Sequence, residues 1–264
     1  SFTKTKLEMP LLHALPFIAY LLSGLLLTRY FVLDSVTNQH RISVNLMLLL
    51  ACSSHGYILF DLWQHNGVFF GLTVSISFVA WVVATLLFLT SFSKPIHSLG
   101  ILVYPLSAIA VIIAFLFPET QGKLLSMSIA AHVFLSIGAY ALLAIAAAQS
   151  VLLSIQERLL HEHNFNTFVD KLPALQSMEE FLYQTLKMGF LLLTLSLISG
   201  YYYIDDFFTQ KLTYKTILSV IAWFGFAGVL LGHKVFGWRG KLVALSTQIA
   251  FSVLVLSYFG TKFF

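Results

Sequence analysis

The stretch "YKTILSVIAWFGFAGVLLGHKVFGWRGK", from Tyr214 to Lys241, decides the class of fold. Its apolar part is continuous and holds no carboxylate, and a helix that crosses a bilayer needs about 20 mostly apolar residues. One histidine, His233, lies where this run gives way to the cations Lys234, Arg239 and Lys241. The stretch therefore predicts a membrane-spanning helix that ends at a basic loop.

The composition of the whole chain extends this interpretation to a polytopic membrane protein. Of the 264 residues, 58% are hydrophobic and only 10% are charged, whereas a water-soluble domain carries about a quarter charged residues. The single cysteine, Cys52, excludes an intramolecular disulfide and a cluster of thiolate metal ligands. The net charge of +4 comes from scattered loop cations, so we expect no nucleic-acid partner.

Eight segments are long and apolar enough to span a bilayer, and their continuous runs lack the period-two alternation of a membrane barrel. We predict an all-α fold, a bundle of about eight transmembrane helices that forms a single integral membrane domain over residues 1–264. The predicted helices cover residues 11–28, 42–60, 68–92, 96–117, 124–153, 181–204, 214–236 and 242–259. The fifth is expected to extend beyond the bilayer through "SIQERLLHEH", and residues 159–180 are predicted to be a polar cytoplasmic linker.

Loop cations predict the orientation, because cytoplasmic loops carry an excess of Lys and Arg. If the loops after the first, third, fifth and seventh helices face the cytoplasm, that side holds 9 of the 15 Lys and Arg residues and the other side holds 6. The loop after the seventh helix is the strongest contributor. We therefore predict a multi-pass protein of the bacterial inner (cytoplasmic) membrane with both termini outside.

The histidines within these segments are candidate functional residues, because ionisable side chains inside spans are costly. By predicted depth they form an outer group (His13, His55 and His132) and an inner group (His97 and His233). His55 and His132 have similar depths, so two facing imidazoles could hold one planar cofactor in an apolar bundle. The alternative is that each neutral histidine bonds a serine or a carbonyl on a neighbouring helix.

The outer loop "YYYIDDFFTQKLTYK" raises a second open choice. Its aromatic residues are typical of an interfacial belt, but a second interpretation is contact with a partner or with a ligand that carries propionates. The residues concerned are Tyr201, Tyr202, Asp205, Asp206 and Lys215. The chain has no phosphate-binding loop, HExxH or GxSxG motif, so no enzyme activity is predicted. Spans that lack carboxylates also argue against a proton-driven transporter.

An ordered set of short motifs in the second half of the chain resembles the cytochrome c assembly family. These motifs are a histidine followed by "LSIGAY", then "SG" before the outer loop, "KTILSVIAW", "HKVFGWRG" and "YFG". That family includes the CcsA-type and CcmC-type haem-handling membrane proteins. Within it, the chain is most similar to the short eight-helix branch of YpjD/HemX-like inner-membrane proteins. The resemblance is strong from His132 to Lys262, and the first four helices agree with the family mainly in their arrangement.

The resemblance implies which histidines would ligate haem. The sequence also departs from the family's pattern in features that bear on its chemistry. The resemblance implies that His132 is an external haem ligand and His233 a transmembrane haem ligand. His55 is a third candidate because of its predicted depth. Most of the bilayer separates the predicted depths of His132 and His233, so they would belong to two haem sites. The tryptophan-rich outer loop of the haem-ligating branches has no tryptophan here, and no second external histidine follows the last helix before "GTKFF".

These features lead to one functional hypothesis and one alternative. The hypothesis is a haem-binding or haem-handling protein without haem-ligation chemistry of its own. It would take haem b as cofactor, with no metal beyond the haem iron. Its partners would be the lipid bilayer, haem and other membrane or cytochrome assembly proteins. The alternative is an accessory or scaffolding subunit of another membrane complex, or a transporter, on a fold that has lost the haem site.

Overall fold

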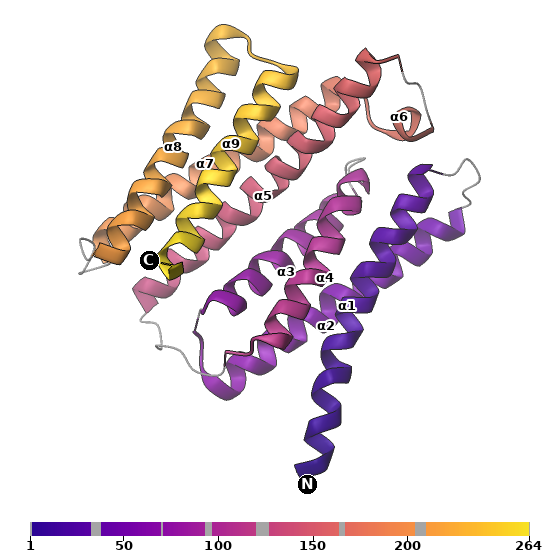
Figure 1. Ribbon diagram of the computed structural model, residues 1–264, viewed down its shortest axis with the longest axis vertical. Helices are drawn as coiled ribbons and strands as arrows, with labels where there is room; N and C mark the ends of the chain where they lie inside the picture. Colours follow the sequence, from indigo (N-terminus) through magenta and orange to yellow (C-terminus); the bar gives the residue numbers. More distant parts are fainter. Residues whose placement is uncertain are drawn as a thin grey trace. The chain divides into compact units, whose positions relative to one another are not determined.

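The computed structural model describes residues 2–32, 38–69, 71–92, 97–119, 127–163, 167–203 and 210–263 (Figure 1). Within these ranges every regular element is helical, which confirms the all-α class. The helices are α1 (Phe2–Val32), α2 (Asn38–Asn66), α3 (Leu72–Thr90), the 3-10 helix η1 (His97–Leu99), α4 (Gly100–Leu116), α5 (Met127–His161), α6 (Thr167–Lys171), α7 (Leu175–Tyr203), α8 (Gln210–Phe236) and α9 (Gly240–Phe263).

Eight of the described helices are long and apolar enough to cross a membrane, as the sequence predicts. Their apolar segments are Leu12–Val32, Ile42–His65, Leu72–Thr90, His97–Leu116, Ser128–His161, Leu175–Tyr202, Tyr214–Phe236 and Gly240–Tyr258. The expected extension of the fifth helix is present, because α5 continues to His161. The predicted linker is shorter than residues 159–180, since α7 already begins at Leu175 and α6 occupies part of the remainder.

The chain divides into two compact units, each of which is described here by itself. The N-terminal unit comprises Ser1–Leu125 and Asn166–Leu172, and the C-terminal unit comprises Ser126–Phe165 and Pro173–Phe264. The short helix α6 thus belongs to the N-terminal unit, although it lies in the sequence between two helices of the C-terminal unit. That the two units form a single integral membrane domain stays a prediction.

In the N-terminal unit, α1 packs on α2 and α4, and α3 packs on the same two helices. A Cβ atom at Gly24 would lie 2.8 Å from the Pro105 ring, so α1 and α4 approach each other closely at this point. The Glu119 carboxylate accepts hydrogen bonds from the backbone N–H groups of the first turn of α3, at 2.9 Å from that of Leu72. It thereby satisfies amides that the helix itself leaves without partners.

In the C-terminal unit, α5 packs against α7 and α9, and α8 packs against α9 and α7. The four helices therefore alternate in direction, as Figure 1 shows for α5, α7, α8 and α9. Small residues permit the close approach that the sequence of α5 predicts. A Cβ atom at Gly189 on α7 would lie 2.8 Å from the Leu143 side chain on α5.

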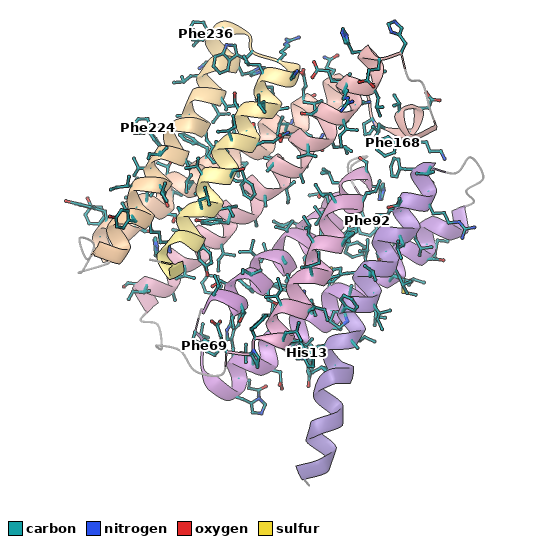
Figure 2. The ribbon with its side chains drawn as sticks, in the orientation of Figure 1. His13, Phe69, Phe92, Phe168, Phe224 and Phe236 are labelled. Atoms are coloured by element: carbon teal, nitrogen blue, oxygen red, sulfur yellow. The ribbon has the colours of Figure 1, made fainter. Side chains whose placement is uncertain are left out.

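The outward face of α8 is apolar, as expected of a helix in contact with lipid. Its exposed large hydrophobic residues include Ile217, Ile221, Phe224 and Leu231, which recur at helical spacing. Figure 2 labels Phe224 on this helix, and its side chain is 64% exposed. The polar residues of α8 instead lie near its two ends, where both candidate sites are found.

Candidate functional site

A polar cluster, called outer after the predicted orientation, lies at the end of the C-terminal unit where α5 and α8 begin and α7 and α9 end. Its members are His132, Ser136, Tyr140, Ser196, Ser199, Lys215, Ser219, Ser257 and Tyr258. Most of them come from the motifs that carry the family resemblance. Motifs that lie far apart in the sequence therefore supply side chains to one place in the fold.

His132, on α5, is held by two serines and a glycine. Its Nδ1 atom lies 3.0 Å from the Ser199 hydroxyl on α7, and its Nε2 atom lies 3.5 Å from the Ser136 hydroxyl. A Cβ atom at Gly200 would be only 3.0 Å from the His132 Cε1 atom, so the absence of a side chain there makes room for the ring. The sequence "SG" thus supplies both a hydrogen-bond partner and space.

The hydroxyl groups around His132 determine which ring nitrogen carries the proton. Ser199 donates its one proton to the Ser196 carbonyl at 2.9 Å, so its oxygen accepts from His132 Nδ1–H. Ser136 donates to the His132 carbonyl at 2.8 Å and receives the proton of the Ser196 hydroxyl at 2.6 Å. The 3.5 Å contact with Ser136 is then the longest at the His132 ring, and a ligand at Nε2 would replace this contact.

A second set of contacts links α5, α8 and α9 in the same cluster. The Tyr140 hydroxyl donates to the Leu254 carbonyl at 3.1 Å and lies 3.1 Å from the Ser257 hydroxyl. Ser219 on α8 donates to the Ser257 hydroxyl at 3.2 Å. Together these contacts position α8 and α9 against α5 beside His132.

Lys215 brings a positive charge to the outer polar cluster. Its Nζ atom lies 5.4 Å from the centroid of the Tyr258 ring on α9, which is a cation–π contact. The same charge is close enough to act electrostatically on the His132 ring. The lysine therefore faces the interior of the four-helix unit although it is the second residue of an apolar span.

His233 forms an inner site at the opposite end of α8. Its Nδ1 atom lies 2.9 Å from the Trp238 carbonyl oxygen. Because a carbonyl only accepts, Nδ1 carries the proton and Nε2 keeps its lone pair. Within the described part of the chain the Nε2 atom has no hydrogen-bond partner, and it is not fully buried. His233 Nε2 is therefore accessible to a ligand.

Tyr183 and the turn between α8 and α9 fix the orientation of His233. The Tyr183 ring stacks on the imidazole with centroids 3.4 Å apart, and its hydroxyl donates to the same Trp238 carbonyl at 2.9 Å. The Trp238 indole packs on Gly232, where a Cβ atom would lie 2.3 Å from the ring. Figure 2 labels Phe236 at this turn, which Gly240 closes with a φ of +56°.

His55 lies in the N-terminal unit and has a different environment from the other two histidines. Its side chain is 1% exposed. The Nε2 atom lies 2.8 Å from the Ser77 hydroxyl, and the Nδ1 atom lies 3.4 Å from the Tyr20 hydroxyl. Both ring nitrogens thus have partners inside one unit, which agrees with the expected alternative of a histidine bonded to neighbouring helices. His132 and His233 share the other unit but lie at opposite ends of it.

Three of the five predicted loop-contact residues lie within the described part of the chain, namely Lys215, Tyr201 and Tyr202. Tyr201 and Tyr202 end α7 with exposed fractions of 66% and 74%, and their rings meet edge to face with centroids 5.6 Å apart. The predicted loop contacts Asp205 and Asp206 lie outside the described residues. The exposure of the two tyrosines fits an interfacial belt.

The sequence-based list of site residues omitted the groups that orient the histidines. These are Ser136, Ser196, Ser199, Gly200, Tyr183, Gly232 and Trp238. Five of them stand in or directly beside the motifs "LSIGAY", "SG" and "HKVFGWRG", which was the available signal. Tyr183 had none, because it lies in none of these motifs and is one of several aromatic residues in the predicted sixth span.

Comparisons with known proteins match between half and most of the chain. The family model described as cytochrome C assembly protein matches residues 69–264, which include the whole C-terminal unit. The inner membrane protein YpjD of Escherichia coli (strain K12) is 34% identical over 131 residues, 50% of this chain and 49% of that protein. The cytochrome c biogenesis protein CcsA of Chlamydomonas reinhardtii is 27% identical over 243 residues, 83% of this chain and 63% of that protein.

The matches cover different shares of this chain and of its relatives. The chain spans about half the length of the first curated relatives that it matches, and no solved structure matches it significantly. The family model nevertheless covers well over half of the chain, including both candidate sites. The chain is therefore a membrane protein of the cytochrome c assembly family, and within that family it falls in the YpjD branch.

Proposed function

We propose that this protein binds haem b at two separate sites in a bacterial inner membrane, with His132 as the outer ligand and His233 as the inner ligand. The observation that carries the proposal is the hydrogen bonding of the two rings at Nδ1. The Nδ1 atom of His132 lies 3.0 Å from the Ser199 hydroxyl and that of His233 lies 2.9 Å from the Trp238 carbonyl, so Nε2 is the nitrogen that would face a metal in each ring. Histidines that bind metals almost always donate their other ring N–H in this way.

The residues around both histidines suit a haem ligand. Haem would supply an iron that His132 or His233 would hold through an imidazole nitrogen. Ser199 fixes the orientation of His132, and the Trp238 carbonyl and the Tyr183 ring fix that of His233. The apolar helices around them limit access of water. His55 is a weaker candidate, because both of its nitrogens have partners in the protein core.

The proposed role is haem handling without covalent attachment of haem. The outer loop has no tryptophan, in contrast to the loop that the family resemblance implies for the haem-ligating branches. The protein would hold haem and pass it to other membrane or cytochrome assembly proteins. An accessory or scaffolding role in another membrane complex is the competing function.

One absorption spectrum distinguishes these two functions. Protein purified in detergent from haem-replete cells is expected to show a Soret band if it binds haem. A colourless preparation that contains a stoichiometric partner protein, and that takes up no added haemin, would support the accessory role and contradict the proposal. The full chain should be used, because neither unit has been shown to fold alone.

The orientation that the proposal requires can be tested with introduced cysteines, because the native Cys52 is buried. We propose that the turn between α8 and α9 faces the cytoplasm and the end of α7 faces outward. A membrane-impermeant maleimide should label Tyr202→Cys in intact spheroplasts, and Arg239→Cys only in inverted vesicles. Both positions are exposed, so the reverse labelling pattern would overturn the orientation.

A further inference from the structure

The positively charged side chain of Lys215 points into the four-helix unit, which is unusual for a lysine near the end of a membrane span. A lysine near the end of a span normally extends along the helix to place its charge in water. Here the ammonium group lies over the Tyr258 ring of α9, and its charge acts on the His132 ring of α5. The side chain is only partly exposed. Its position therefore brings the charge toward His132 and the core of the unit.

The described residues contain no carboxylate that pairs with Lys215. The ion pairs in these ranges are His65 with Asp61 and Arg158 with Glu162, and neither involves this lysine. The other side chains of the outer polar cluster are hydroxyl groups and an imidazole, which carry no negative charge. A partly buried charge without a counter-ion is unfavourable in an apolar medium. An anionic group from a ligand would relieve this cost.

We propose that Lys215 binds a carboxylate of the tetrapyrrole whose iron is ligated by His132. This inference rests on the proposed haem-binding function, and it adds the group that recognises the ligand's edge. The site then holds the ligand at two points, through a neutral imidazole at the metal and through an ammonium group at a propionate. The hydroxyl groups of Tyr140, Ser219 and Ser257 already have partners within the protein, so Lys215 is the group left to pair with an anion.

Two-point recognition has a specific consequence for selectivity. A charge-assisted hydrogen bond between an ammonium group and a carboxylate contributes more than a neutral hydrogen bond. The outer site should therefore prefer haem over haem dimethyl ester, which carries the same iron and ring but no charged carboxylate. This preference should depend on Lys215.

The test is to titrate two proteins, each of them once with haem and once with haem dimethyl ester. Both proteins carry His233→Ala, so that only the outer site is measured, and one also carries Lys215→Met. The expected result is that Lys215→Met weakens binding of haem by at least about tenfold, the size of one charge-assisted hydrogen bond. Binding of the dimethyl ester should be unchanged. Lys215→Arg should retain most of the affinity for haem.

A control variant and the other possible results decide whether Lys215 contacts a carboxylate of the ligand. Lys241→Met, at the opposite end of the same unit, should leave both affinities unchanged. Equal weakening of haem and ester by Lys215→Met would show that the lysine only supports the fold, and no weakening of either would show that it contacts no carboxylate. Either result overturns the inference while the haem site stands. If the protein with Lys215 intact binds neither ligand, the proposed outer site itself is wrong.

Discussion

Replacing both His132 and His233 with alanine is expected to abolish haem binding, and each single replacement should remove one of two bound haems. The reason is that each ring presents one Nε2 lone pair, at opposite ends of the same four-helix unit. Loss of the only proposed protein ligand leaves the iron at that end without an axial nitrogen. The measurement is haemin titration of the purified variants, followed by the Soret absorbance.

A matched control and a rescue experiment separate ligand loss from misfolding. His161, which is exposed at the end of α5, lies on the same helix as His132, and His161→Ala should bind as much haem as the wild-type protein. Free imidazole should restore the Soret band of His132→Ala or His233→Ala by occupying the vacated position. If both single variants keep the full haem content of the wild type, neither histidine is a ligand.

Replacing Gly232 with alanine is expected to weaken haem binding at the inner site by about 10–100-fold, the usual effect of losing a group that orients a metal ligand. The new methyl group would lie 2.3 Å from the Trp238 ring, so the indole must move. The Trp238 carbonyl, which accepts from His233 Nδ1, would move with it. His233 would keep its identity but lose the contact that fixes its orientation and protonation.

The chain offers a matched control for this change. A Cβ atom at Gly228, one turn earlier on α8, would meet no other atom within 4 Å, so Gly228→Ala should not alter haem affinity. Titrations in a His132→Ala background isolate the inner site. If Gly232→Ala and Gly228→Ala give the same affinity, the Trp238 carbonyl does not control His233.

The spanning helices could be predicted from the sequence because apolar runs of bilayer length are a strong local signal. The span from Tyr214 to Phe236 agrees with the prediction at both ends. The helix α7 begins at Leu175, earlier than the predicted residue 181, because the polar stretch "LQSMEE" is helical and continuous with the apolar run. Hydropathy locates the membrane segment, whereas hydrogen bonding and packing decide where the helix begins.

The candidate site was predictable only in part. His132 and His233 stood out as ionisable residues in apolar segments within motifs of a known family. Ser199 belongs to the "SG" motif, but its contact with His132, which lies 67 residues away in the sequence, could not be predicted from that motif. The depth of His55 matched that of His132, but depth alone could not show that Ser77 and Tyr20 engage both of its ring nitrogens.

The central claim, that the chain holds haem at two histidines, is tested most directly by haemin titration of the full-length wild-type protein in detergent. The account predicts saturation of the Soret absorbance at two haems per chain, one at His132 and one at His233. Saturation at one haem would leave only a single site. A protein that takes up no haemin, under conditions in which it stays folded and monodisperse, would contradict the account.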